Sequence, residues 1–259
     1  MNDKRNADMF SLKGKKAIVT GGTRGLGMEI ARAYHDAGAD VVLWGRSPQG
    51  ADVARQMGGD QNNVFFVQCD LSDSAQITPA VERSLELLQG RVDILVNGAG
   101  MQHRTPALDF EEDCWRSILE VNLTAVFLVS QRVGRHMIEQ GKGRIINIAS
   151  MCSFFGSVNI PAYTASKGGI AQLTKALSNE WASKGINVNA IAPGYMETQL
   201  TRDIKQKNPG QYAEITSRIP KGRWGQPEDI RGLAVFLASE AAEYISGAII
   251  PLDGGYLGK

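Results

Sequence analysis

Cysteine and histidine are scarce in this chain of 259 residues. Its three cysteines, Cys69, Cys114 and Cys152, are scattered and form no Cys-x-x-Cys pair. An odd and unpatterned set argues against a disulfide framework and favours reduced thiols in a cytoplasmic protein. The three histidines show no paired spacing either, so a zinc site or other metal centre is not expected.

Long apolar runs and an excess of one charge are missing too. No apolar run approaches the ~18 residues of a membrane span, and residues 1–9 are polar, without the apolar centre of a signal peptide. The net charge of +1 gives no basic surface for nucleic acid. These absences leave a small molecule as the expected partner, with no nucleic acid and no membrane.

Short apolar runs alternate instead with helical patterns along the chain. The strand-like runs lie at 16–20, 40–44, 64–68, 92–96, 143–148, 186–191 and 248–252. Helical patterns lie between them at 24–37, 47–58, 73–89, 109–140, 161–184 and 227–240. This alternation predicts an α/β fold, a doubly wound parallel sheet of about seven strands with helices on both faces. We expect one domain over 10–259, after a flexible tail at 1–9.

A glycine-rich turn separates the first strand from the first helix. The strand 16–20 runs directly into Gly21, Gly25 and Gly27, spaced Gly-x-x-x-Gly-x-Gly, and a helical pattern follows. Glycine permits a tight turn and a close approach of backbone to a pyrophosphate, and the helix N-terminus offers N–H donors to its charge. The order of strand, turn and helix predicts a dinucleotide site, with an ordinary turn as the alternative.

Tyr163 and Lys167 form the most informative pattern in the chain. Four residues apart on a helix, they lie one turn apart on the same face. A phenol titrates near pH ~10, and an adjacent ammonium can lower that pKa by roughly 1–3 units. Ser150, thirteen positions upstream of the tyrosine, can hydrogen-bond a substrate oxygen held against the phenol. The set predicts a proton-transferring tyrosine; the alternative is a surface lysine beside a half-buried tyrosine.

Six motifs in order carry a resemblance to a known family. They are Thr20-Gly21-x-x-x-Gly25-x-Gly27, Asn97-Gly98-Ala99-Gly100, Asn122, Ser150, Tyr163-x-x-x-Lys167 and Pro193-Gly194. Together they resemble the short-chain dehydrogenase/reductase family over nearly the whole chain. The resemblance implies a Rossmann fold and reversible hydride transfer between a nicotinamide cofactor and a secondary alcohol or ketone. Gly98 departs from the family's usual second asparagine, so contacts of that side chain are not expected.

The resemblance also implies the site residues. The catalytic set is Ser150, Tyr163, Lys167 and Asn122, with Asn122 joining Lys167 through water in a proton relay; the alternative is that Asn122 bonds backbone inside its helix. Asp70 would meet the adenine, although it could instead cap the following helix. The expected cofactor contacts are Gly21, Thr23, Arg24, Gly25, Leu26, Gly27, Arg46, Asp70, Leu71, Asn97, Gly98, Ala99, Tyr163, Lys167, Pro193, Gly194, Met196 and Thr198.

Arg46 bears on the choice of cofactor. It ends the second strand, where a carboxylate would hold a ribose 2′-hydroxyl and an arginine would accommodate a 2′-phosphate. Arg24, inside the glycine turn, could add a second cation for the same phosphate. The sequence therefore favours NADP(H). NAD(H) remains possible, because Arg46 could stack on adenine instead.

The C-terminal half looks like the sugar-acid branch of the family. The stretches 192–198 and 218–225 carry this resemblance, and members of the branch include 2-deoxy-D-gluconate 3-dehydrogenase, 2-keto-3-deoxy-gluconate dehydrogenase and gluconate 5-dehydrogenase. It implies a sugar acid or keto-uronate as substrate. His103 and Arg104 could bind its carboxylate, or could simply be a solvated loop. The irregular stretch 194–226 is expected to be a substrate lid, with a surface insertion as the alternative.

The sequence is also compatible with two other functions, a carrier or carbonyl reductase and a redox sensor, and it predicts a homo-oligomer. A 3-ketoacyl-carrier or general carbonyl reductase is the rival enzyme, although a carrier would favour a basic patch that the net charge of +1 does not indicate. A dinucleotide-binding redox sensor without catalysis would not need Ser150, Tyr163 and Lys167 together. The helical stretches 109–140 and 161–184 carry apolar residues on more than one face, so they predict subunit contact, as a homotetramer or a dimer.

Overall fold

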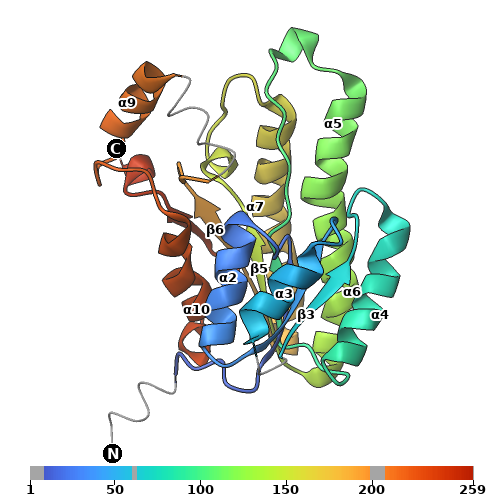
Figure 1. The fold of residues 1–259 in the computed structure, drawn as a ribbon. Coiled ribbons are helices and arrows are strands. Elements are labelled where there is room, and N and C mark those ends of the chain that lie inside the picture. Colours follow the sequence, from blue (N-terminus) through green and yellow to red (C-terminus); the bar gives the residue numbers. More distant parts are fainter. Residues whose placement is uncertain (1–8, 60–62, 199–207, 259) are drawn as a thin grey trace, which may run out of the picture.

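Seven parallel strands form one sheet at the centre of the computed structural model, which describes residues 9–59, 63–198 and 208–258 (Figure 1). The strand order is β3-β2-β1-β4-β5-β6-β7. The strands are β1 Lys16–Thr20, β2 Asp40–Gly45, β3 Val64–Gln68, β4 Ile94–Asn97, β5 Gly143–Ile148, β6 Ile186–Pro193 and β7 Ile249–Leu252. The predicted α/β class and doubly wound sheet are confirmed. The predicted tail lies almost wholly outside the described residues.

Successive strand residues face opposite sides of the sheet, so each side has its own core. In β1, Val19 packs with residues of α2, α3 and α10, whereas its neighbour Ile18 packs with residues of α4, α6 and α7. Both side chains are fully buried. Because a parallel sheet covered on both faces is buried throughout, its strands read as continuous apolar runs, which is why the sequence located them.

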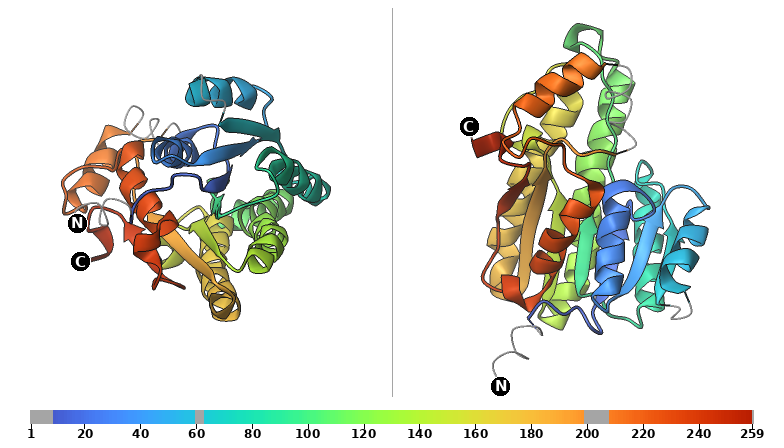
Figure 2. Two further views of the ribbon diagram at one scale, coloured as in Figure 1. Left: turned by 90° about the horizontal axis from the view of Figure 1, so that it is seen from below. Right: turned by 60° about the vertical axis from the view of Figure 1, so that its left-hand side comes forward.

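The helices cover the two faces in separate groups (Figures 1 and 2). On one side lie α2 Gly25–Asp36, α3 Gly50–Gly58 and α10 Arg231–Ala238. On the other lie α4 Ile77–Leu87, α6 Ala125–Gln140 and α7 Pro161–Trp181, with α5 Glu112–Leu119 leading into α6. The helix α9, Pro209–Ser217, lies beyond the carboxyl ends of the strands. No helix of the described chain is both long and apolar enough to cross a bilayer.

Two predicted boundaries shift for identifiable reasons. The fourth strand was expected from Val92 but begins at Ile94, because the Gln140 side chain bonds both the N–H and the C=O of Val92 at 3.1 and 2.7 Å. The expected helix 109–140 is interrupted by a π-helical segment, Glu120–Thr124, which connects α5 to α6. A single π turn within a helix often marks a functional position.

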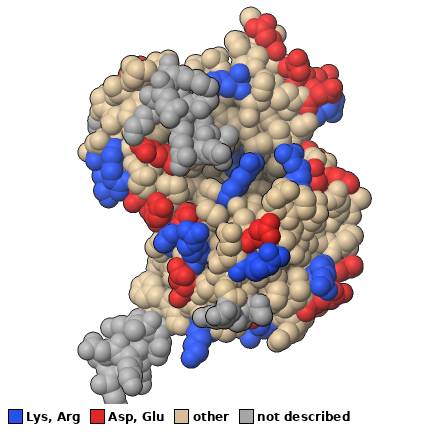
Figure 3. Space-filling view, viewed as in Figure 1, with Lys and Arg blue, Asp and Glu red and all other residues tan. Residues whose placement is uncertain are grey.

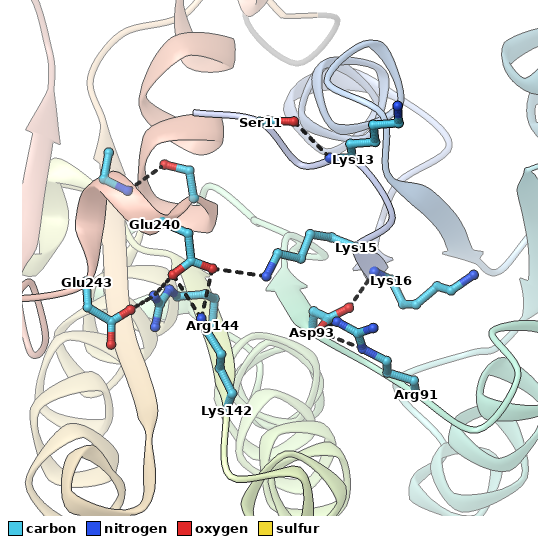
Figure 4. A network of polar contacts seen from close by, with 12 residues as sticks. Ser11, Lys13, Lys15, Lys16, Arg91, Asp93, Lys142, Arg144, Glu240 and Glu243 are labelled. Carbon is cyan, nitrogen blue, oxygen red and sulfur yellow. Dashed lines mark hydrogen bonds and ion pairs between the residues drawn. The ribbon is translucent and has the colours of Figure 1, made fainter. Parts of the chain in front are cut away.

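A network of ion pairs joins the opposite, amino-terminal ends of the strands (Figure 4). Glu240 accepts from Lys15 at 3.1 Å and from Lys142 at 2.9 Å, and lies 3.8 Å from Arg144. Arg144, whose side chain is 5 % exposed, also pairs with Glu243. These cations hold the pKa of Glu240 down at about 2, with the Lys142 bond as the largest cause. The network ties the residues after α10 to the base of the sheet, away from the strand ends that carry the predicted site.

Candidate active site

β1 and β4 are neighbours in the sheet, and the chain leaves them toward opposite edges of the sheet. Ligands of open α/β folds bind at such a switch point, beyond the carboxyl ends of the strands. Thr20 closes β1, and its hydroxyl accepts hydrogen bonds from the N–H groups of Gly98 and Ala99 at 3.1 and 3.3 Å. A Cβ atom on Gly21, whose φ is +66°, would lie 2.8 Å from the Cα of Ala99. The two loops therefore approach so closely that glycine is required at their contact.

The first turn of α2 has the features of a phosphate site. Arg24 precedes the helix in an extended conformation and gives no side-chain cap, and the first turn holds no acidic residue. The N–H groups of this turn thus have no side-chain acceptor and no competing negative charge. Gly25 has a φ of +56° and open space where a Cβ would be. These observations fit the pyrophosphate of a dinucleotide at this helix end.

Arg46 and Asp70 lie together beyond the ends of β2 and β3. The Asp70 carboxylate accepts from the N–H and the hydroxyl of Ser72 at 3.0 and 2.8 Å. The Ser72 N–H is the largest cause that lowers the pKa of Asp70, and the Arg46 guanidinium lowers it further. Asp73, not Asp70, caps the following 3₁₀ turn. Arg46 and Arg24 are both exposed, and basic side chains border a hollow on this side of the molecule (Figure 3).

The Asn97 side chain points into the protein rather than toward this cleft. Its amide donates to Ser130 at 2.9 Å and to Asn147 at 2.8 Å, and Asn147 continues the ladder to Thr174 at 2.9 Å. Asn97 is 2 % exposed. A cofactor contact at this position would thus involve the backbone that follows, at Gly98 and Ala99.

The structure brings Ser150, Tyr163 and Lys167 together at one end of the sheet. Ser150 follows β5 and caps a 3₁₀ turn, while Tyr163 and Lys167 lie on the first two turns of α7. The Lys167 Nζ lies 5.6 Å from the centre of the Tyr163 ring and donates to the C=O of Ile148 at 2.6 Å. Ser153 joins the two elements, since its hydroxyl donates to the C=O of Lys167 at 2.6 Å.

The predicted effect of Lys167 on the tyrosine is wrong for this structure. Burial raises the pKa of Tyr163 to about 12, and only the nearby Ser150 hydroxyl lowers it. Burial also lowers the pKa of Lys167 to about 8. Removal from water disfavours both charged forms, and the ammonium is directed at a backbone carbonyl instead of the phenol oxygen. At neutral pH the Tyr163 phenol is therefore protonated and uncharged, whereas the Lys167 amine, with a pKa of about 8, is still mostly protonated.

Asn122 lies within the π-helical segment and is fully buried. Its side chain accepts from the Met101 N–H at 2.8 Å and donates to the Met101 C=O at 2.9 Å. It therefore bonds backbone, but of the loop after β4 rather than of its own helix. A Cβ on Gly100 would lie 3.5 Å from the Asn122 Oδ1 and 3.8 Å from the Lys167 Nζ, so the amide and the ammonium flank this glycine.

The loop after β6 begins at Gly194 and joins an aromatic cluster. Met196 is buried and forms an isolated parallel β-bridge with Gly225. The N–H of Thr198 donates to the Met196 C=O at 2.9 Å. Tyr195 lies 5.2 Å from Trp224 and 5.6 Å from Tyr256 between ring centroids. Of the predicted lid, the structure describes 194–198 and 208–226, in which Met196, Ile215, Ile219 and Trp224 are buried. Residues 199–207 lie outside the described residues.

His103 and Arg104 are both exposed, on the loop that leaves Gly100. The His103 ring bonds the Thr105 hydroxyl at 2.7 Å and meets Phe110 edge to face at 5.7 Å. The N–H of Thr105 donates to the C=O of Asn159 at 2.8 Å, which ties this loop to the one after β5. Both residues therefore lie on an exposed loop that contacts the loop after β5, which carries Ser150.

Comparison with known proteins decides the family. The family model described as "Enoyl-(Acyl carrier protein) reductase" matches residues 21–257. The chain is 47 % identical to the 2-dehydro-3-deoxy-D-gluconate 5-dehydrogenase of Bacillus subtilis (strain 168), covering 97 % of this chain and 98 % of that one. The chain belongs to the short-chain dehydrogenase/reductase family. As a member, it is an oxidoreductase, and the predicted family is confirmed.

Two further short-chain dehydrogenases support this assignment. The gluconate 5-dehydrogenase of Gluconobacter oxydans (strain 621H) is 38 % identical, covering 96 % of each chain. The crystal structure of a gluconate 5-dehydrogenase from Burkholderia cenocepacia J2315, in complex with NADP and tartrate, is 39 % identical. It superimposes with a TM-score of 0.93, covering 98 % of this chain and 99 % of that one.

Sequence reasoning missed several residues that this short-chain dehydrogenase places near Ser150. Phe155, Tyr195 and Tyr256 come from the loops after β5, β6 and β7, and Arg218 follows α9. Their rings and the guanidinium are in contact. No spacing in the sequence links them, because they meet only where three neighbouring strands end.

Proposed function

We propose that the protein is a dehydrogenase/reductase that favours NADP(H) and acts on the secondary alcohol or ketone of a sugar acid or keto-uronate. The arrangement of Ser150, Tyr163 and Lys167 at the strand ends that also carry the glycine turn is the observation that supports it most. The names of the relatives, gluconate and 2-dehydro-3-deoxy-D-gluconate 5-dehydrogenases, support the substrate class.

Each catalytic residue has a role that its position supports. When bound, the nicotinamide cofactor supplies or accepts the hydride. In reduction, Tyr163 gives its proton to the substrate oxygen, which Ser150 orients and polarises. Lys167, held between Ile148 and Gly100, would contact the ribose of a bound cofactor and would return a proton toward Tyr163. Asn122 fixes the Met101 backbone beside Lys167 and completes the proton relay with water.

The cofactor side is formed by the glycine turn and the ends of β2, β3, β4 and β6. The open, uncapped N-terminus of α2 would hold the pyrophosphate of a bound dinucleotide. The exposed Arg46 and Arg24 receive a 2′-phosphate, which favours NADP(H) over NAD(H). The NADP complex of the relative from Burkholderia cenocepacia supports this preference. The other contacts follow the predicted set: Gly21, Thr23, Leu26, Gly27, Asp70, Leu71, Asn97, Gly98, Ala99, Pro193, Gly194, Met196 and Thr198.

The substrate enters between the loop after β4 and the segment after β6. His103 and Arg104, which are exposed on the loop after β4, contact its hydroxyl groups. The described parts of 194–226 cover the site as a lid. Subunits associate as a homotetramer through 109–140 and 161–184, a proposal supported by the exposed Phe127 on α6. A cytoplasmic location is proposed from the three free thiols.

A substrate panel tests the proposed function. kcat/KM is measured with NADPH and NADH for keto-uronates, keto-gluconates, gluconates and acetoacetyl thioesters. We expect a keto-gluconate, gluconate or keto-uronate to be the best substrate, and NADPH to be preferred over NADH. Preference for acetoacetyl thioesters would reject the sugar-acid assignment in favour of a carrier reductase. Cofactor binding without turnover of any compound would indicate a redox sensor.

A further inference from the structure

Arg218 is a cation near the site whose charge is not neutralised. It follows the last turn of α9 and is exposed. No carboxylate of the described chain lies within ion-pair distance of it. The nearby Arg223 differs, because it donates to both oxygens of Asp229, at 2.6 and 3.0 Å. Of these two arginines, Arg218 is therefore the one available to an incoming anion.

The ring of Tyr256 holds the Arg218 guanidinium in place. The guanidinium carbon lies 5.0 Å from the centre of that ring, within the range of an attractive cation–π contact. Tyr256 is itself fixed by Phe155, stacked at 6.2 Å, and by Tyr195, edge to face at 5.6 Å. A planar cation stacked on a fixed ring has lost much of its freedom already, so binding an anion costs it little further entropy.

This cluster belongs to the same end of the sheet as the catalytic residues. Phe155, Tyr195 and Tyr256 follow β5, β6 and β7, which are adjacent in the sheet. Ser150 and Cys152 precede Phe155 on the same loop, and Cys152 lies close enough to affect the pKa values of both Tyr163 and Tyr195. Tyr195 is likewise affected by Arg218. Ring contacts from Phe155 to Tyr256, and from Tyr256 to Arg218, thus connect the loop that carries Ser150 to the guanidinium.

We propose that Arg218, stacked on Tyr256, binds the carboxylate of the substrate while Ser150 and Tyr163 hold its reacting oxygen. This inference rests on the proposed sugar-acid function. A guanidinium pairs with a carboxylate through two parallel N–H donors, which fixes both the position and the orientation of the acid. The carboxylate group would then decide which carbon of the chain reaches Tyr163. Arg104, on the loop after β4, contacts hydroxyl groups rather than the acid.

The test compares a sugar acid with its methyl ester, which keeps the shape and removes the charge. The acid is the one that the wild-type enzyme turns over best. For the wild type we expect a higher kcat/KM with the acid. Arg218→Gln is expected to raise KM for the acid at least ~10-fold, with kcat and the ester kinetics nearly unchanged. Arg218→Lys should recover only part of this loss, because an ammonium lacks the planar fork.

Two variants serve as comparisons. Lys221→Gln removes an exposed cation of the same segment and should keep the preference for the acid. Arg104→Gln should weaken acid and ester alike. NADPH affinity and the melting temperature of each variant are measured to confirm that the fold is kept.

The outcomes separate this inference from the proposed function. If the wild type prefers the acid and Arg218→Gln keeps that preference, the carboxylate site is wrong and the function stands. The site is also wrong if Arg218→Gln weakens acid and ester equally, or if Arg104→Gln alone abolishes the preference. A wild type that prefers the ester or a thioester would reject both proposals.

Discussion

Lys167 lies one helical turn from Tyr163, with its ammonium 5.6 Å from the centre of the phenol ring and its hydrogen bond directed to Ile148. The two groups are close enough to work together, yet in this structure burial governs both. The pKa of Tyr163 is raised to about 12 and that of Lys167 is lowered to about 8. The protein alone therefore keeps the phenol protonated, ready to donate.

The buried ammonium predicts a pH-dependent stability. The pKa of Lys167 falls from 10.5 to about 8 on folding, so between these values the unfolded chain binds more protons. Its contribution to the free energy of unfolding thus increases with pH across that window. Relative to Lys167→Met, the wild type should gain stability between pH 8 and 10, measured by urea unfolding. The exposed Lys175→Met on the same helix is the control, and an equal gain relative to that variant would contradict the assignment.

Removing the phenol hydroxyl should separate chemistry from binding. Tyr163→Phe is expected to lower kcat at least ~10²-fold, because the proton donor is lost. NADPH affinity, followed by fluorescence titration, should stay near the wild-type value. Tyr244→Phe makes the same chemical change at a fully exposed ring and should leave kcat unaltered. A near-wild-type rate for Tyr163→Phe would refute its role.

The cofactor preference should depend on Arg46. Arg46→Ala removes a cation proposed to meet the 2′-phosphate, so KM for NADPH should rise roughly 10-fold while KM for NADH stays unchanged. Arg55→Ala, which removes an exposed arginine paired with Asp52 on α3, is the matched control. Equal effects of Arg46→Ala on the two cofactors would indicate stacking on adenine instead.

The contact between Gly98 and Thr20 should make position 98 intolerant of a side chain. A Cβ there would lie 2.8 Å from the Thr20 carbonyl oxygen, whereas a Cβ on Gly100 meets nothing closer than 3.5 Å. Gly98→Ala is therefore expected to destabilise by about 1–3 kcal/mol through overpacking. Gly100→Ala should lower the melting temperature much less. Equal melting temperatures would show that the two loops can separate without cost.

The ion pairs of Glu240 should matter at neutral pH and fade in acid. Its pKa is lowered from 4.5 to about 2, so this stabilisation is present above pH 4.5 and is lost as the pH falls toward 2. The side chain is 42 % exposed, so solvent screens the pairs and Glu240→Gln should cost about 1 kcal/mol at pH 7. Thermal unfolding at several pH values measures it. Glu86→Gln, from a more exposed pair, should change little, and a deficit of Glu240→Gln that persists at pH 2 would contradict the account.

Most of the fold could be read from the sequence. Strands buried on both faces are short apolar runs, and each run was located within two residues of its observed ends. The largest departures from the predicted boundaries depend on distant contacts. The Gln140 side chain hydrogen-bonds the backbone N–H and C=O of Val92, so β4 begins two residues later than predicted. The π-helical segment that contains Asn122 interrupts a helix that the sequence periodicity predicts as continuous. The partners of Gln140 and Asn122, Val92 and Met101, lie far away in the sequence. Local sequence patterns therefore could not predict these two changes.

The site divides in the same way. The sequence by itself determined the glycine turn, the proximity of Tyr163 to Lys167 and the reaction class, because strand, turn and helical spacing fix these locally. Only the tertiary structure decided the burial that shifts the pKa values of Tyr163 and Lys167, the inward direction of Asn97 and the meeting of Phe155, Tyr195, Tyr256 and Arg218. Burial and contacts between loops of separate strands are properties of the packed chain, and no spacing along the sequence encodes them.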